Sequence, residues 1–582
     1  MIARLLFVTL LPLTAMAAGA DTAAAMDPAF KPALDMLRRV PLQHGGRIKP
    51  LDSFARDAIL LVSERRSLRG DSAAPGEDAV VTVLRWLSDG EAWSQKKFIV
   101  VSHRPALTLL GLDPLRGLYS PVELAQAPGF ASATESINRK SSTGIKLTAA
   151  EQALSRSLGK IDAFQSIATG SAWTMVPAPQ GWLALSDERA AESGLPQLFS
   201  RILNELFHTG PLSDRAAATR QLAEEILSRQ ALLLLKLEKA TPSTLPSSPE
   251  NPVGLTAIAA RVNQEVRYNE VRPFQKSWIL YLVAFILIAL GMGMSNARSG
   301  TARGFKIAGL AVGLGAFALH SYGFVLRCLL TGRPPVTNMY ESTVGVPWGV
   351  VLFAIIISVI HRKHPRVSAV GAAAAAVAAL SLLMADSAPA VLDPTIKPLE
   401  PVLRSNYWLT IHVLTITLSY GAFALSLGLG NLVLALHAFR PKMKEAISHY
   451  TLFTYRAVQF GVVLLAAGTI LGGVWADYSW GRFWGWDPKE TWALIALLFY
   501  IAVLHGKWAG WLKPFGMVLC TVLCFNGVLM AWYGVNFVLG VGLHSYGFGA
   551  GGLEYVGIFV ASQFVFCAMV AAVNAKRQRA GR

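Results

Sequence analysis

Cysteine and charge are both scarce in this sequence. Only four of the 582 residues are cysteines, and neither a C-x-x-C pair nor a C-x-x-C-H motif occurs. The chain is therefore neither a thioredoxin-like reductant nor itself a c-type cytochrome. Charged residues make up only 15% of the chain, whereas hydrophobic residues make up 53%. This composition is typical of a polytopic membrane protein.

Acidic residues are fewer than basic ones, 36 against 53, which gives a net charge of +17. Much of this excess lies in alternate loops between apolar segments, as the positive-inside rule predicts for cytoplasmic loops. The basic residues of these loops and of the C-terminal tail are Arg298, Arg303, Lys306, Arg362, Lys363, Arg366, Arg440, Lys442, Lys444, Arg456, Lys507, Lys513, Lys576, Arg577, Arg579 and Arg582. The membrane thus explains the net charge, and no nucleic-acid-binding module is needed to account for it.

The N-terminal part of the chain has the character of an exported protein. Residues 1–20 combine a basic start, a short apolar stretch and small residues at the end, the pattern of a secretory signal peptide. An uncleaved anchor helix is the alternative, and residues from 21 onward are exported in both cases. Residues 21–275 are soluble in character, with helical apolar spacing at 149–158 and 217–239. We predict a mainly helical exported domain here, without a repeat or a metal-ligand cluster.

Two short stretches of this domain have a distinct character. Residues 241–252, TPSTLPSSPENP, are rich in proline and serine and predict a loop or linker. Residues 43–50, QHGGRIKP, are interpreted as a docking turn.

Nine apolar segments follow from residue 276 onward, each near the roughly 20 residues that cross about 30 Å of hydrocarbon. They lie at about 277–294, 305–325, 343–360, 367–385, 408–437, 457–475, 491–508, 514–533 and 553–574. The predicted fold is an all-α polytopic membrane protein with about nine transmembrane helices in residues 276–575 and a basic cytoplasmic tail at 576–582. The charge alternation predicts that the N-terminal domain lies on the exported side of the membrane, which for a bacterial inner-membrane protein is the periplasm.

Five of the 15 tryptophans lie between residues 475 and 492, here called the tryptophan segment: Trp475, Trp480, Trp484, Trp486 and Trp492. Acidic and basic residues are interspersed among them, which a helix at the centre of a bilayer does not tolerate cheaply. We predict that residues 476–490 form a loop at the outer membrane face that holds a flat, apolar ligand with charged edges. An ordinary aromatic belt at the interface is the alternative.

Two histidines flank the tryptophan segment on the same predicted face. His412 lies near the outer end of the 408–437 helix, and His544 lies in the outer loop after the 514–533 helix. Histidine is a common axial ligand of haem iron. The pair therefore predicts a bis-histidine haem site against the indole rings, unless each histidine only caps a helix or bonds a backbone carbonyl.

Two further histidines lie inside predicted spans. His505 lies in the inner half of the 491–508 helix. Two interpretations are open for it: it binds haem that arrives from the cytoplasmic side, or its side chain reaches towards the inner membrane interface. His320 lies nearer the outer end of its helix, at the wrong depth to pair with His505. Arg327 and Arg333 follow it and are candidates to meet haem propionates.

These segments together resemble the CcsA (ResC) family of system II cytochrome c biogenesis. Trp480–Glu490 resembles the tryptophan-rich WWD signature of haem-handling proteins, which system I proteins share. The other matching segments are Thr491–Leu494 with Leu504 and His505, Arg333–Ser342, Tyr407–Val413 and Asn536–Tyr546. The resemblance covers about residues 276–575 and says little about the exported domain.

The resemblance implies a role for each matching residue. His412 and His544 would be the external axial ligands of haem b, and His505 would be the transmembrane ligand. The shelf that positions the haem would comprise Trp480, Trp484, Trp486 and Asp487. In this family the second transmembrane ligand comes from a CcsB (ResB) half, which this chain does not contain. We therefore expect a separate CcsB-like membrane partner.

The implied function is that of a cytochrome c synthetase (haem lyase) component. The protein would move haem b to the outer face and present it for thioether attachment to the C-x-x-C-H motif of apocytochrome c, whose thiols thioredoxin-like proteins keep reduced. A system I-type haem exporter or chaperone subunit without ligase activity is the main alternative. A structural assembly factor is another. A b-type electron carrier would place paired histidines at matching depths within its helices, which this sequence does not offer.

Overall fold

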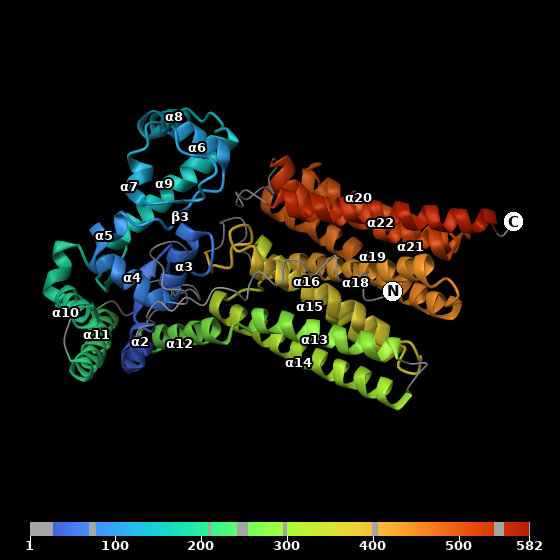
Figure 1. Ribbon diagram of the computed structural model, residues 1–582, viewed down its shortest axis with the longest axis horizontal. Coiled ribbons are helices and arrows are strands. Elements are labelled where there is room, and N and C mark those ends of the chain that lie inside the picture. The colour runs from blue at the N-terminus through green and yellow to red at the C-terminus, as the bar shows by residue number, and fades with distance from the viewer. Residues whose placement is uncertain are drawn as a thin grey trace. The chain divides into compact units, whose positions relative to one another are not determined.

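The computed structural model describes residues 27–68, 77–207, 211–240, 254–294, 299–398, 406–540 and 552–580. The chain divides into two compact units, Met1–Asn269 and Glu270–Arg582 (Figure 1). The predicted signal peptide, the linker at 241–252 and His544 lie outside the described residues. The domain boundaries expected from the sequence therefore stay predictions.

Helices make up most of the N-terminal unit, as predicted. Its elements are η2 (Pro28–Phe30), α2 (Lys31–Leu37), β1 (Pro41–His44), β2 (Arg47–Pro50), α3 (Leu51–Ser63), α4 (Ala79–Ser88), α5 (Gly90–Ser94), β3 (Ile99–Val100), α6 (Arg104–Leu110), β4 (Leu118–Tyr119), α7 (Pro121–Ala125), α8 (Phe130–Ser142), α9 (Ala149–Ala168), β5 (Thr174–Val176), β6 (Leu183–Ala184), η3 (Glu188–Ser193), α10 (Leu195–Phe207), α11 (Leu212–Ala240) and α12 (Leu255–Val271). The strands form three separate antiparallel pairs, so no extended sheet is built from the described residues.

Aromatic side chains form the centre of the core in this unit. Trp86 of α4 is fully buried and stacks on Phe98, with ring centroids 5.4 Å apart. The same indole meets Phe164 of α9 edge-on at 5.5 Å. Offset and edge-on ring contacts are the favoured arrangements for aromatic pairs, and here they hold α4 against α9.

A β-hairpin at residues 41–50 is held to α12 by a buried ion pair. Gly45 and Gly46 have φ angles of +62° and +79°, as a tight turn between two strands requires. Arg47 donates to both carboxylate oxygens of Glu265 at 2.8 and 2.7 Å, and the two side chains are 1% and 2% exposed. All four residues of β2 are buried. The stretch interpreted as a docking turn thus has a packing role, and docking stays a prediction.

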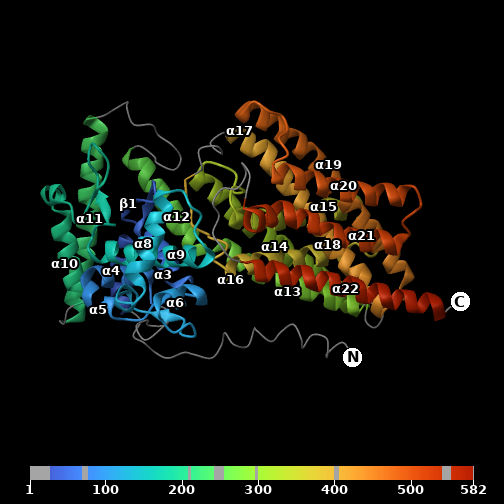
Figure 2. The same ribbon diagram turned by 90° about the horizontal axis from the view of Figure 1, so that it is seen from above.

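Long apolar helices build the second unit. They are α13 (Pro273–Gly293), α14 (Ser299–Thr331), α15 (Met339–Ile360), α16 (Ser368–Ser387), α17 (Asn406–Trp408), η5 (Leu409–Val413), α18 (Leu414–Phe439), α19 (Lys444–Trp480), α20 (Pro488–Trp508), α21 (Pro514–Leu529), η6 (Met530–Leu539) and α22 (Leu553–Ala580). The long helices run roughly parallel in both views (Figure 2). Nine helices of the described residues are long and apolar enough to cross a membrane, which confirms the predicted number.

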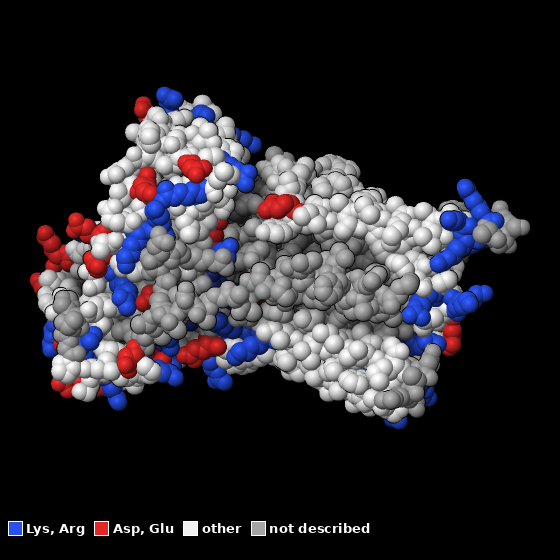
Figure 3. Space-filling view, viewed as in Figure 1, with Lys and Arg blue, Asp and Glu red and all other residues white. Residues whose placement is uncertain are grey.

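Charged side chains are distributed as a membrane protein requires. Figure 3 shows a broad uncharged band along this unit and a gathering of Lys and Arg at the end that holds the C-terminus. A multi-pass membrane protein follows from this band and from the nine helices.

The helix α19 is longer than its predicted span. It begins at Lys444 and ends at Trp480, and its 37 residues extend over about 55 Å. Residues 475–480 are therefore helical, and only 481–487 separate α19 from α20. The prediction of a loop over 476–490 was wrong in its extent, because indole rings at the end of α19 pack without ending the helix.

Two spans contain π-helical turns. Residues 409–413 (η5) begin the span that continues as α18, and residues 530–539 (η6) end the span that begins as α21. Such turns insert an extra residue into a helix and are frequent at functional sites. Both turn out to line the same pocket, as described below.

The buried ion pair of the N-terminal unit gives a first prediction. Replacement Arg47→Met leaves the carboxylate of Glu265 buried without its charge partner, so we expect a loss of about 3–5 kcal/mol in the unfolding free energy of this unit. Hydrogen exchange of residues 41–50 in the full chain measures it. Arg189→Met is the matched control, because Arg189 pairs with Asp187 on the surface, where the loss of an ion pair has little effect on stability. Equal exchange in both variants would contradict the assignment.

Candidate functional site

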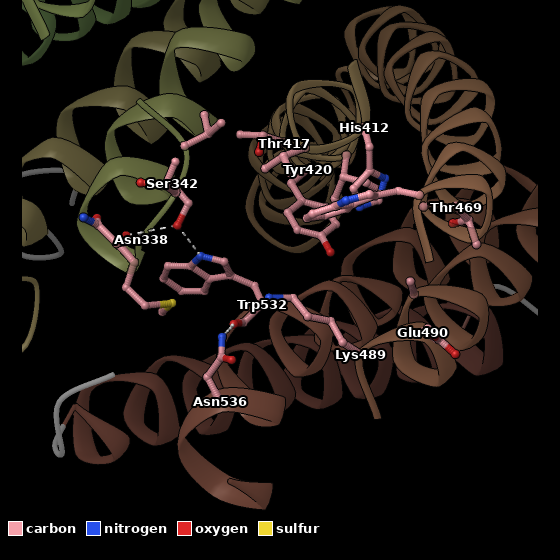
Figure 4. A pocket seen from close by; sticks show the side chains of 18 of the residues that line it. Asn338, Ser342, His412, Thr417, Tyr420, Thr469, Lys489, Glu490, Trp532 and Asn536 are labelled. Atoms are coloured by element: carbon pink, nitrogen blue, oxygen red, sulfur yellow. Dashed lines mark hydrogen bonds between the residues drawn. The ribbon is translucent and has the colours of Figure 1, made fainter. Parts of the chain in front are cut away.

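Segments that are far apart in the sequence line one pocket in the membrane unit (Figure 4). Its walls are Val336, Thr337, Asn338, Met339, Ser342, His412, Val413, Ile416, Thr417, Tyr420, Thr469, Gly472, Gly473, Trp475, Trp484, Lys489, Glu490, Ala493, Trp532 and Asn536. The empty space is about 1150 Å³, a volume that includes the part open to solvent.

His412 of η5 is held in a fixed orientation at this pocket. Its Nδ1 lies 2.8 Å from the carbonyl oxygen of Gly468. Since a carbonyl can only accept, Nδ1 carries the proton, and Nε2 is the nitrogen suited to bind iron. The ring lies 5.6 Å from that of Trp475. It also lies against Gly472, where a Cβ would come within 2.6 Å of the imidazole.

The tryptophan segment contributes to the pocket unequally. Trp475 and Trp484 line it, whereas Trp480 stacks on Trp475 with ring centroids 6.4 Å apart. Trp486 is 70% exposed, meets Trp484 edge-on at 5.9 Å and has a φ of +57°. A side chain in this left-handed conformation is uncommon. Two rings of the segment, those of Trp475 and Trp484, therefore line the pocket. Each contacts a second ring, that of Trp480 and that of Trp486 respectively.

Asp487 and Glu490 hold the non-helical part of this segment in place. Asp487 is the N-cap of α20 and accepts a hydrogen bond from the backbone N–H of Lys489 at 3.0 Å. Glu490 accepts from the N–H of Gly485 at 2.8 Å and pairs with Arg482 at 3.1 Å. Capping boxes of this kind fix a helix N-terminus. Asp487 is thus a positioning residue in the structure, and a catalytic role for it stays a prediction.

The opposite wall comes from the segment before α15 and from η6. Trp532 donates from its indole N–H to Ser342 Oγ at 2.7 Å, which joins η6 to α15. Asn536 donates to the carbonyl of Trp532 at 3.0 Å, within the same π-helical turn. Sequence reasoning did not identify Tyr420 or Trp532, because single aromatic side chains in apolar helices are also common core residues. Asn536 was included only as the start of a segment that resembles the CcsA family, without a role of its own.

Arg327 and Arg333 build the scaffold of that wall. Arg327 forms an ion pair with Glu341 at 2.9 Å, in which both side chains are 1% exposed, and donates to the carbonyl of Pro394 at 3.0 Å. Arg333 donates to the carbonyl of Lys397 at 2.8 Å. Neither arginine lines the pocket. Their contact with haem propionates stays a prediction without support from these contacts.

The remaining predicted ligands lie elsewhere. His320 is fully buried, with Nε2 3.1 Å from the carbonyl of Val344 and Nδ1 3.4 Å from the hydroxyl of Tyr281, so both ring nitrogens have protein partners. His505 of α20 is exposed, and its Nδ1 donates to the carbonyl of Ile501 at 2.9 Å. Neither histidine lines the pocket. For His544 the structure offers no description.

The segments that line this pocket all lie within a region that matches a known protein family. The family described as Cytochrome C assembly protein matches residues 336–544. The cytochrome c biogenesis protein CcsA of Prochlorococcus marinus is 31% identical over 300 residues, which cover 46% of this chain and 92% of that protein. A CcsA of another strain of this species is 34% identical over 256 residues, covering 38% and 79%.

The chain belongs to the CcsA family of cytochrome c biogenesis proteins. Protein NrfI of Wolinella succinogenes is 28% identical over 527 residues, which cover 86% of this chain and 53% of that protein. The chain thus spans about half the length of NrfI. Because 86% of the chain exceeds the membrane unit, the similarity to NrfI extends into the N-terminal unit, beyond the part shared with the CcsA proteins.

Glu490 offers a test of how the tryptophan segment is held. Glu490→Gln removes the charge that pairs with Arg482 and weakens the bond from the Gly485 amide, so we expect a loss of about 1–3 kcal/mol in local stability. Hydrogen exchange of residues 481–487 measures it. Glu445→Gln is the control, since Glu445 pairs with Arg366 at an exposed position. Unchanged exchange at 481–487 would show that the rings alone hold the segment.

Proposed function

We propose that this protein brings haem b to the pocket at the outer membrane face and presents it for covalent attachment to apocytochrome c. The observation that carries the proposal is the arrangement of His412, Trp475 and Trp484 around one pocket. An imidazole beside indole rings suits a porphyrin, because iron takes a nitrogen ligand and the macrocycle stacks on aromatic faces. The membership in the CcsA family agrees with this cargo.

The reaction proposed is the addition of two thiols to two vinyl groups. In each addition the sulfur of a C-x-x-C-H cysteine bonds to one vinyl carbon, and a proton goes to the other carbon. No electrons are gained or lost, although the thiols must be reduced beforehand, which we assign to thioredoxin-like proteins. The pocket contributes placement, because held reactants combine in an effectively unimolecular step. His412 and His544 would bind the iron from opposite faces.

A separate CcsB-like protein is the proposed membrane partner. His505 lies in a membrane-spanning helix and is exposed on it. An imidazole that faces hydrocarbon is costly unless a partner receives it. His505 would then bind haem together with a ligand from this partner before the haem moves outward.

The protein would lie in the bacterial inner membrane, with the N-terminal unit and the pocket on the periplasmic side. Basic residues gathered at the C-terminal end of the membrane unit support this orientation (Figure 3). Apocytochrome c would meet the pocket on the periplasmic side.

The external site is tested by substitution of its proposed ligands. We expect His412→Ala and His544→Ala to lose the bis-histidine haem spectrum and to reduce cytochrome c maturation at least about tenfold, because each removes an iron ligand. Absorption spectra of the protein purified with its partner and the yield of covalent cytochrome measure these effects. His361→Ala, a membrane-unit histidine outside the pocket, is the control. Retention of spectrum and maturation in both variants would refute the external site.

The transmembrane site has its own readout. We expect His505→Ala to reduce the amount of haem that co-purifies with the protein, since it removes the proposed ligand on the route to the pocket. The haem-to-protein ratio measures this effect independently of any attachment. An unchanged ratio would remove His505 from the route.

The alternative of a system I-type haem exporter or chaperone makes a different prediction, and the tryptophan segment alone fits both families. Co-expression of this protein with only a CcsB-like partner and an apocytochrome c separates them. Covalent cytochrome c is the outcome expected for a ligase, and haem-loaded protein without covalent product is the outcome expected for a chaperone.

A further inference from the structure

Lys489 places an ammonium group at the pocket. It lies in the first turn of α20, and its side chain lines the cavity with those of Glu490 and Ala493 (Figure 4). Indole rings of Trp484 and Trp532 form much of the surrounding wall. The setting is therefore an amphiphilic cavity with a cation on one side.

The acids next to Lys489 are committed to other groups. Asp487 caps α20 by accepting from backbone N–H groups, that of Lys489 among them. The charge of Glu490 is balanced by Arg482 at 3.1 Å. The charge of Asp487, two residues earlier, attracts the ammonium group of Lys489, although Asp487 is not among the residues that line the pocket. Lys489 is thus the one lysine or arginine among the described residues that line the pocket, and Glu490 is the one carboxylate among them.

The ammonium group of Lys489 belongs to the wall of a cavity whose other lining residues are mostly apolar or aromatic. The backbone N–H groups at the start of α20 already have carboxylate partners in Asp487 and Glu490, so the helix end itself offers no open anion site. A charged group is favourable beside apolar side chains only when opposite charge is near it. A ligand that carries a carboxylate or a similar anion would supply such a charge from within the cavity, through a charge-assisted hydrogen bond.

We propose that Lys489 binds a propionate carboxylate of haem and thereby fixes how the macrocycle is turned within the pocket. This inference rests on the proposed function. The propionates of haem b lie on the edge opposite the two vinyl groups, so a propionate at Lys489 directs the vinyl groups away from the N-terminus of α20. Lys489 then decides which edge of the haem is presented to the thiols. The arginines expected from the sequence to take this role, Arg327 and Arg333, are engaged with other protein groups.

The test compares haem b with haem dimethyl ester, in which both carboxylates are blocked. Full-length protein in detergent, with His505→Ala in every sample so that the outer site alone is titrated, is reconstituted with each compound. We expect haem b to bind about tenfold more tightly than the ester, the value of a charge-assisted hydrogen bond. Lys489→Gln should lower the affinity for haem b to that for the ester and leave the ester unaffected. Lys489→Arg should retain most of the preference.

Lys444→Gln is the matched control, because Lys444 is exposed at the start of α19 and does not line the pocket. The proposal fails if Lys489→Gln keeps the preference for haem b, or if it weakens both compounds equally, since a loss that ignores the carboxylates is not carboxylate recognition. If the protein without a Lys489 substitution binds neither compound, the proposed haem site itself fails, and that result is distinct from a lost preference.

Discussion

The carboxylate of Glu490 connects the parts of the membrane unit on which the pocket depends. It receives the backbone N–H of Gly485 and balances the charge of Arg482, and so it fixes the short connection between α19 and α20. Through that connection Trp484 is placed on the cavity and Lys489 begins the next helix. The Glu490 side chain is only 10% exposed, so a lost partner would leave a largely buried carboxylate poorly satisfied, which makes this one carboxylate a strong constraint on the geometry around it.

The polar side chains of the membrane unit are of two kinds: some are paired with other protein groups, and others line the pocket or are exposed on a helix. Arg327 forms an ion pair with Glu341, and the ring nitrogens of His320 contact a carbonyl and a hydroxyl. These groups therefore hold helices together. Lys489 lines the cavity, and His505 is exposed on a membrane-spanning helix. Groups of the second kind are unfavourable in the isolated chain and become favourable with a cargo or partner. The distinction gives a physical reason to expect that haem and a second membrane protein complete this one.

Hydropathy and motif spacing predicted much of this protein, and tertiary contacts account for the rest. Nine spans were expected and nine helices are found in the described part of the chain, because a run of about twenty apolar residues has few other uses. The ring of His412 lies 5.6 Å from that of Trp475, as the flanking positions in the sequence suggested, while its role as an iron ligand stays a prediction. The partners of Arg327 could not be read from the sequence, because Glu341 of α15 and Pro394, which follows α16, approach it only once these elements have packed against α14. Trp532 was missed for a similar reason: its hydrogen bond to Ser342 joins residues 190 positions apart.

The π-helical turns η5 and η6 have a consequence for how this pocket is formed. Each residue of an α-helix turns the chain by about 100°, so one residue inserted into a regular helix swings every side chain on one side of the insertion to a new face. His412 and Trp532 both occupy such turns. The wider π-helical turns of both spans therefore shift the angular positions of the side chains along them, and His412 and Trp532 line one pocket from two separate spans. The pocket therefore depends on two places, η5 and η6, at which the helical repeat of an otherwise regular bundle changes.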